Sequence, residues 1–126
     1  MSNKVTTKVA ELTIDGDGII HMTFFKNVKV NLEEAKNILI ARKEFPMEDG
    51  MQRMLVDMRN TPQPEREARE YAKAEEVINV TRGMALLVDG PMSKLLGNFF
   101  LGFNKGGFPT KLFTDTKEAK TWLLQL

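Results

Sequence analysis

Cysteine is absent from the chain, and His21 is its only histidine. The lack of cysteine excludes disulfides, thiolate metal sites and cysteine catalysis, and it suits a reducing cytoplasm. A single histidine cannot build the common zinc sites. We therefore expect a cytoplasmic protein with no metal and no cofactor.

Charge of one sign and long apolar runs are also lacking. Eighteen basic and seventeen acidic residues leave a formal charge of +1 with no basic cluster, so we expect no nucleic-acid partner. The longest apolar region, Met84 to Phe103, is interrupted by Asp89, Lys94 and Asn98, which argues against a transmembrane segment. A length of 126 residues predicts one domain, 1–126.

The first part of the chain predicts a β-hairpin. Lys8–Asp15 and Ile19–Phe25 both alternate apolar and polar side chains, as half-buried strands do. Asp15–Gly18 resembles the start of an EF-hand calcium loop. Such a loop needs a carboxylate at its twelfth position, and counting from Asp15 that position is Lys26. We interpret Asp15–Gly18 as the hairpin turn.

A helix and a strand follow. Asn31 and Glu34 have capping-box spacing, and Pro46 ends the helix before the strand Arg53–Asp57. The residues that share one stripe of this helix are Leu32, Ala35, Ile38, Leu39 and Arg42. The methionines around the strand are Met47, Met51, Met54 and Met58. Filling gaps in a core is their expected role, with an adaptable binding surface as the alternative.

The second half predicts further α/β units. After a turn-rich connector, a helix opens at Pro64 and ends at Gly83. The run from Met84 is apolar on both alternating sets of side chains, which predicts a strand in the middle of the sheet. A helix over Pro91–Phe103, a turn and a strand over Pro109–Thr114 come next.

The chain closes with a helix that begins at a capping box, Asp115 to Glu118, and that we expect to dock through Trp122. The resulting order is β-β-α-β-α-β-α-β-α. We predict an α/β fold with a mixed sheet of about five strands, in which the last four are parallel and the first is antiparallel at an edge.

Four stretches carry a likeness to a known family: Arg66–Tyr71, Ala85–Asp89, Gly97–Asn104 and Pro109–Asp115. In these motifs the chain resembles small bacterial STAS/SpoIIAA-like proteins, particularly an uncharacterised branch. The resemblance implies a SpoIIAA-like β-α superhelix. For the best-known relatives it implies anti-sigma-factor antagonists that are switched by serine phosphorylation.

The serine switch does not carry over to this chain. The stretch that matches the phosphorylated connector, Asp57 to Thr61, contains no serine, and its only hydroxyl belongs to Thr61, just before Pro62. That position favours a cap or a turn over a phosphoacceptor. We expect the switch to be absent or altered.

The carboxyl ends of the parallel strands form the expected rim for a polar ligand or a regulatory contact. The residues predicted there are Asp57, Arg59, Asn60, Thr61, Asp89, Ser93, Thr114 and Asp115. Helix capping is the alternative role for Asp89 and Asp115. His21 has no acid or nucleophile beside it in the sequence, so a packing or surface role is favoured over catalysis.

The helix Pro91–Phe103 is apolar around most of its circumference. The large apolar side chains that are spread around this helix are Leu96, Phe99, Phe100 and Phe103. They predict a partner or self-association surface, with complete burial inside the monomer as the equal alternative.

These observations favour a non-enzymatic STAS-like module that binds another protein or itself as a homodimer. The alternative is a domain that binds an apolar small molecule or lipid, as in the related Sec14-like architectures. An enzyme is third, because no convergent set of titratable groups stands out.

Overall fold

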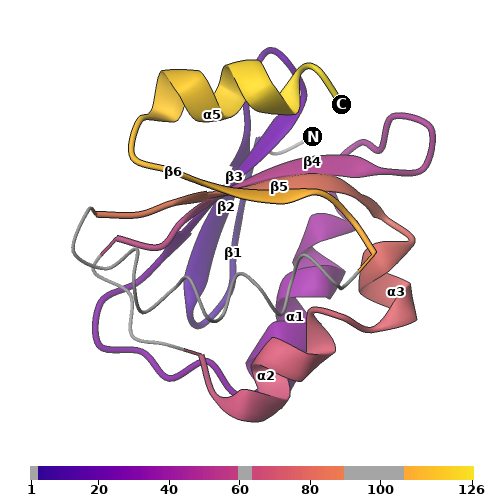
Figure 1. Ribbon diagram of the computed structural model, residues 1–126. Coiled ribbons are helices and arrows are strands. Elements are labelled where there is room, and N and C mark those ends of the chain that lie inside the picture. The colour runs from indigo at the N-terminus through magenta and orange to yellow at the C-terminus, as the bar shows by residue number, and fades with distance from the viewer. Residues whose placement is uncertain (1–2, 60–63, 90–106) are drawn as a thin grey trace.

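The computed structural model describes residues 3–59, 64–89 and 107–126. These residues form a six-stranded mixed sheet with helices on both faces (Figure 1). The strands are β1 Lys4–Thr6, β2 Ala10–Ile14, β3 Ile19–Phe24, β4 Gln52–Asp57, β5 Thr81–Leu87 and β6 Thr110–Phe113. The helices are α1 Leu32–Arg42, α2 Arg66–Tyr71, α3 Glu75–Ile78 and α5 Thr116–Leu123.

The strands lie in sequential order across the sheet. β3 to β6 are parallel, as predicted, and β2 is antiparallel to β3. The expectation of about five strands with the first at an edge was wrong, because β1 pairs with β2 through Val5 and Leu12 and takes the edge itself. β1 has only three residues, Lys4–Thr6, which is too short for an alternating pattern to be recognised.

The first turn and the first helix cap form as the sequence indicates. Asp15 Oδ1 accepts hydrogen bonds from the N–H groups of Asp17 and Ile19 at 2.9 and 3.1 Å. Asn31 Oδ1 accepts from the Glu34 N–H at 2.9 Å at the start of α1. Oε2 of Glu34 is buried without a hydrogen-bond partner in the described part of the chain.

The helix predicted between Pro64 and Gly83 is two short helices, α2 and α3. Ala74, between them, has an extended backbone with φ −68° and ψ 147°. β5 then begins at Thr81, so Gly83 lies inside a strand and does not end a helix. A Cβ at Gly83 would meet the Leu126 side chain, and glycine therefore leaves room for the chain after α5 to pack on β5.

Two cores lie on opposite faces of the sheet. The larger one lies beneath α1, α2 and α3, and the smaller one beneath α5 (Figure 1). In the smaller core Ala119 and Leu123 are fully buried, whereas Trp122 is partly buried, with its ring centroid 5.6 Å from that of Phe113. Leu123 is thus the centre of the α5 contact, and Trp122 flanks it.

The prediction of a mid-sheet strand is confirmed for β5, which pairs with β4 on one side and β6 on the other. Side chains from Met84 to Val88 are buried on both faces. Among the described helices, none has the length and hydropathy needed to cross a membrane.

Candidate functional site

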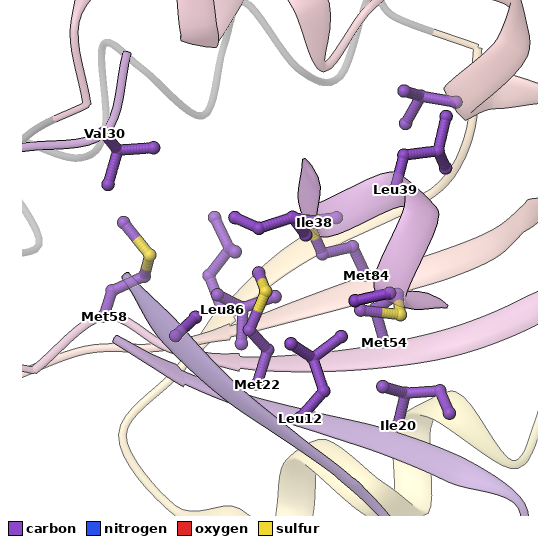
Figure 2. Close-up of a cluster of buried hydrophobic side chains, with 14 of the residues drawn as sticks. Leu12, Ile20, Met22, Val30, Ile38, Leu39, Met54, Met58, Met84 and Leu86 are labelled. Carbon is purple, nitrogen blue, oxygen red and sulfur yellow. The ribbon is translucent and has the colours of Figure 1, made fainter. Parts of the chain in front are cut away.

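An apolar cavity of about 110 Å³ lies between the sheet and the helices α1, α2 and α3. Its floor comes from alternate residues of three parallel strands. Met54 and Met84 are direct neighbours on β4 and β5, and Met22 of β3 lies opposite Val56 of β4. Figure 2 shows Met22, Met54 and Met84 in the cluster beneath Ile38 and Leu39 of α1.

Small side chains on the helices explain why space remains above this floor. Ala35 of α1, Ala68 of α2 and Ala72 just after α2 line the cavity, and each presents a single methyl group. The thioether side chains opposite them are unbranched and polarizable, so they adapt to guests of different shape. Small residues on the helices and flexible methionines on the strands therefore form an apolar cavity that can adjust to its ligand.

The size of the cavity limits what it can hold. A dry apolar cavity of about 150 Å³ is enough for benzene, whereas drug-sized ligands occupy pockets of about 300–1,000 Å³. A cavity of about 110 Å³ matches a short alkyl group or a small ring. It is too small for a whole lipid.

One buried cation, Arg42, lies in the cavity wall. Its side chain is 3% exposed, and its Nε donates to Gln52 Oε1 at 3.1 Å. Its Nη2 donates to the Val80 carbonyl at 3.2 Å and to Thr81 Oγ1 at 3.0 Å. Burial lowers the pKa of Arg42 to about 10, so the guanidinium is charged at neutral pH. All of these acceptors are neutral.

Tyr71 of α2 brings a phenol to the same cavity. Burial, together with a hydrogen bond to the Glu76 carboxylate, raises the pKa of Tyr71 to about 12. The phenol therefore keeps its proton at neutral pH and offers a polar group without a negative charge.

The predicted polar rim is only partly within the described residues. Asp57 accepts from Arg59 Nε at 3.0 Å and from Nη2 at 2.9 Å, and the hydrogen bond and charge of Asp57 raise the pKa of Arg59, with a further contribution from Asp89. Successive side chains of a strand point to opposite faces of the sheet. Val56 of β4 lines the cavity, so the carboxylate of Asp57, the next residue, lies on the face away from it. Asn60, Thr61 and Ser93 lie outside the described residues.

Two other predicted rim residues lie at the start of α5. Asp115 Oδ2 accepts from the Glu118 N–H at 2.9 Å, so it caps α5 as its sequence position indicates. Thr114 directly precedes this cap. Capping is therefore the role that the structure gives to Asp115.

The predicted partner surface on 91–103 falls wholly outside the described residues. This applies to Leu96, Phe99, Phe100 and Phe103. Their part in self-association stays a prediction.

His21 has an acid beside it, contrary to the expectation from its sequence neighbours. The first hairpin folds Asp15 back so that its Oδ2 lies 2.8 Å from His21 Nε2, and Lys120 Nζ of α5 lies 3.1 Å from the same oxygen. This contact ties the hairpin to α5. Over 3–59, 64–89 and 107–126, no group of three or more His, Cys, Asp or Glu side chains is arranged to hold a metal ion.

Sequence reasoning missed Gln52 and the charge of Arg42 as site features. Gln52 is 2% exposed and also donates from Nε2 to the Arg42 carbonyl at 2.8 Å, which fixes the end of α1 against β4. The available signal was an arginine within the apolar stripe of α1. A charge at such a position indicates either a buried tether or a ligand contact.

Comparison with known proteins places the chain in a family. A model described as "Domain of unknown function (DUF7793)" matches residues 12–126. The chain belongs to this family. No curated protein matches it.

The DUF7793 chain is also similar to a crystal structure of a protein with unknown function from Arthrobacter sp. FB24. The two are 28% identical over 91% of this chain and 99% of that one, with a TM-score of 0.32. A TM-score of that size does not establish a shared fold. Neither comparison names STAS or SpoIIAA proteins, so that resemblance remains a prediction.

Proposed function

We propose that this DUF7793 domain is a non-enzymatic binding module that holds a small apolar molecule, or the apolar end of a larger one, between the sheet and α1–α3. The observation that carries the proposal is the mainly apolar cavity of about 110 Å³, whose wall includes methionines of three strands and alanines of the helices. Apolar concave sites with a few polar groups are the usual form of small-ligand pockets.

Two of the polar residues in the wall, Arg42 and Tyr71, have pKa values that favour binding over catalysis. Arg42 and Tyr71, with pKa values of about 10 and 12, both keep their protons at pH 7. A general acid or base works best with a pKa near the operating pH. These groups are suited to orient a ligand and poorly suited to exchange protons with one.

Met-methyl NMR with toluene as the probe tests this function. We expect the methyl signals of Met22, Met54 and Met84 to shift saturably in the wild type. Ala35→Leu fills the cavity and should weaken the binding at least about tenfold, since it replaces a wall methyl with a larger side chain. Lys36→Leu adds the same side chain on the exposed face of α1 and is the matched control. Unshifted methionine signals in the wild type would contradict the proposal.

A second candidate is binding of a protein partner or a second copy of the chain through one apolar anchor side chain. The methionine-rich wall favours it, because such surfaces accommodate varied partners and a pocket of this size suits a single anchor. The STAS-like sequence motifs agree with this role and with a SpoIIAA-like arrangement in a bacterial cytoplasmic protein. Light scattering tests whether the chain binds a second copy of itself. A homodimer in the wild type and in Lys36→Leu, together with a monomer in Ala35→Leu, would support self-association through this pocket.

A further inference from the structure

The bonding of Arg42 leaves part of its guanidinium unused. Nε and Nη2 donate to Gln52, Val80 and Thr81, whereas Nη1 donates to none of the residues that the structure describes. Arg42 also forms no ion pair within those ranges. Within the described residues, Arg42, which is 3% exposed, is thus held by neutral acceptors.

A charge in this setting carries a cost. Removing an ion from water is unfavourable, and the three hydrogen bonds of Arg42 do not offset this completely, because burial still lowers its pKa to about 10. A tether between α1 and the sheet does not itself require a charge, because neutral amides form such hydrogen bonds. Arg42 lines a cavity large enough for a small ligand, so its charge is placed where it can pair with an anionic group of that ligand.

The place of Arg42 in the fold puts this charge at one end of the cavity. Its hydrogen-bond partners Gln52 and Thr81 are the first residues of β4 and β5. Met58, which follows the last residue of β4, lines the cavity farther along, and Figure 2 shows it beside Val30, away from Met54 and Met84. The cavity therefore has the buried cation Arg42 at one end, and Arg69 and Tyr71 of α2 are the other polar residues in an otherwise apolar wall.

Building on the function proposed above, we infer that the ligand is a small carboxylic acid with a short apolar tail, whose carboxylate pairs with Nη1 of Arg42. The planar guanidinium suits a carboxylate oxygen, and charge-assisted hydrogen bonds are roughly twice as strong as neutral ones. The tail lies against Met54, Met84 and Met22. The volume of about 110 Å³ limits the tail to a short branched chain or one ring.

Titration calorimetry of the wild-type protein with 3-methylbutanoate and 3-methylbutanol at pH 7 tests the inference. The two compounds share a tail and differ in charge. We expect the acid to bind at least about tenfold more tightly, because it gains a charge-assisted hydrogen bond. Equal binding of acid and alcohol would overturn the role of Arg42 and leave the apolar-binding function standing. Binding of neither compound would contradict both.

Two variants locate the effect. Arg42→Met should abolish the preference for the acid while retaining the alcohol. Arg42→Gln keeps a neutral donor for the tether to Gln52 and Thr81, and it should also reduce acid binding at least about tenfold. Arg66→Met removes an arginine whose side chain is 83% exposed and should leave the preference unchanged. Persistence of the acid preference in either Arg42→Met or Arg42→Gln would refute the pairing, so one folded variant is sufficient.

Discussion

Asp15 and His21 meet across the first hairpin, with 2.8 Å between Asp15 Oδ2 and His21 Nε2. Burial alone would raise the pKa of Asp15. The hydrogen bonds from His21, the Ile19 N–H, Lys120 and the Asp17 N–H outweigh burial and lower it to about 2 from 3.8. One carboxylate thus joins β2, β3 and α5.

This contact predicts a pH dependence of folding stability. Because the pKa of Asp15 is lower in the folded state, its contribution is complete above about pH 4 and is lost as the pH falls toward 2. The side chain is partly exposed, so solvent screening limits the contribution to about 1 kcal/mol. Urea unfolding of Asp15→Asn should show a deficit of that size at pH 6 that disappears near pH 2. Asp17→Asn, at a side chain that is 53% exposed, is the control. An equal deficit at both pH values would contradict this assignment.

Two neighbouring leucines at the carboxyl end of α5, Leu123 and the C-cap residue Leu124, give a matched test of how this helix docks. Leu123 is fully buried against the sheet, whereas Leu124 is 47% exposed. Leu123→Ala should lower the free energy of unfolding by about 2–5 kcal/mol, because it removes buried methyl groups and leaves a cavity. Leu124→Ala should change it by less than about 0.5 kcal/mol. Similar losses in the two variants by chemical denaturation would show that α5 docks differently.

The elements that the sequence predicts well are those with a strong local signal. Asn31 and Asp115 cap the helices that they precede, and the apolar run around Leu86 is buried in the middle of the sheet. Capping is decided by residues three positions apart, and two-sided burial requires a continuous apolar run. Neither depends on distant parts of the chain.

The features that escape prediction depend on distant contacts or weak local preferences. β1 forms because β2 offers it an edge, and the break at Ala74 lies in a sequence with good helix formers on both sides. The Asp15–His21 contact needs the hairpin to close. The cavity arises where α1 and α2 place alanines over methionines from three strands, a juxtaposition that only the tertiary fold creates.

The cap at Asn31 predicts a graded series of stabilities. Asn31→Ala removes the acceptor of the Glu34 N–H and should cost about 0.5–2 kcal/mol. Asn31→Asp retains an acceptor oxygen at the amino end of α1 and should stay close to the wild type. Thermal and urea unfolding will rank the three proteins. A wild-type stability for Asn31→Ala would mean that this hydrogen bond contributes nothing net.

Arg53 of β4 forms hydrogen bonds with the carboxyl end of α5, and these bonds give a further prediction. Its Nε donates to the Leu123 carbonyl at 2.9 Å, which also accepts from the Leu126 N–H at 3.2 Å, and its Nη2 donates to the Leu126 carbonyl at 2.7 Å. One guanidinium from β4 thus holds the end of α5 and the residues after it. Arg53→Met keeps an apolar stem and loses both donors, and it should cost about 1.5–3 kcal/mol.

Hydrogen exchange and the fluorescence of Trp122, the only tryptophan, measure this effect at α5 itself. In Arg53→Met the amides of α5 should exchange faster while those of β4 and β5 keep most of their protection, because the lost bonds hold only the end of the helix. Glu48→Gln removes the exposed partner of Arg53 Nη1, at 3.2 Å, and should change little, since surface ion pairs contribute about 0–1 kcal/mol. Faster exchange in Glu48→Gln equal to that in Arg53→Met would assign the effect to the ion pair and refute the role of the carbonyl contacts.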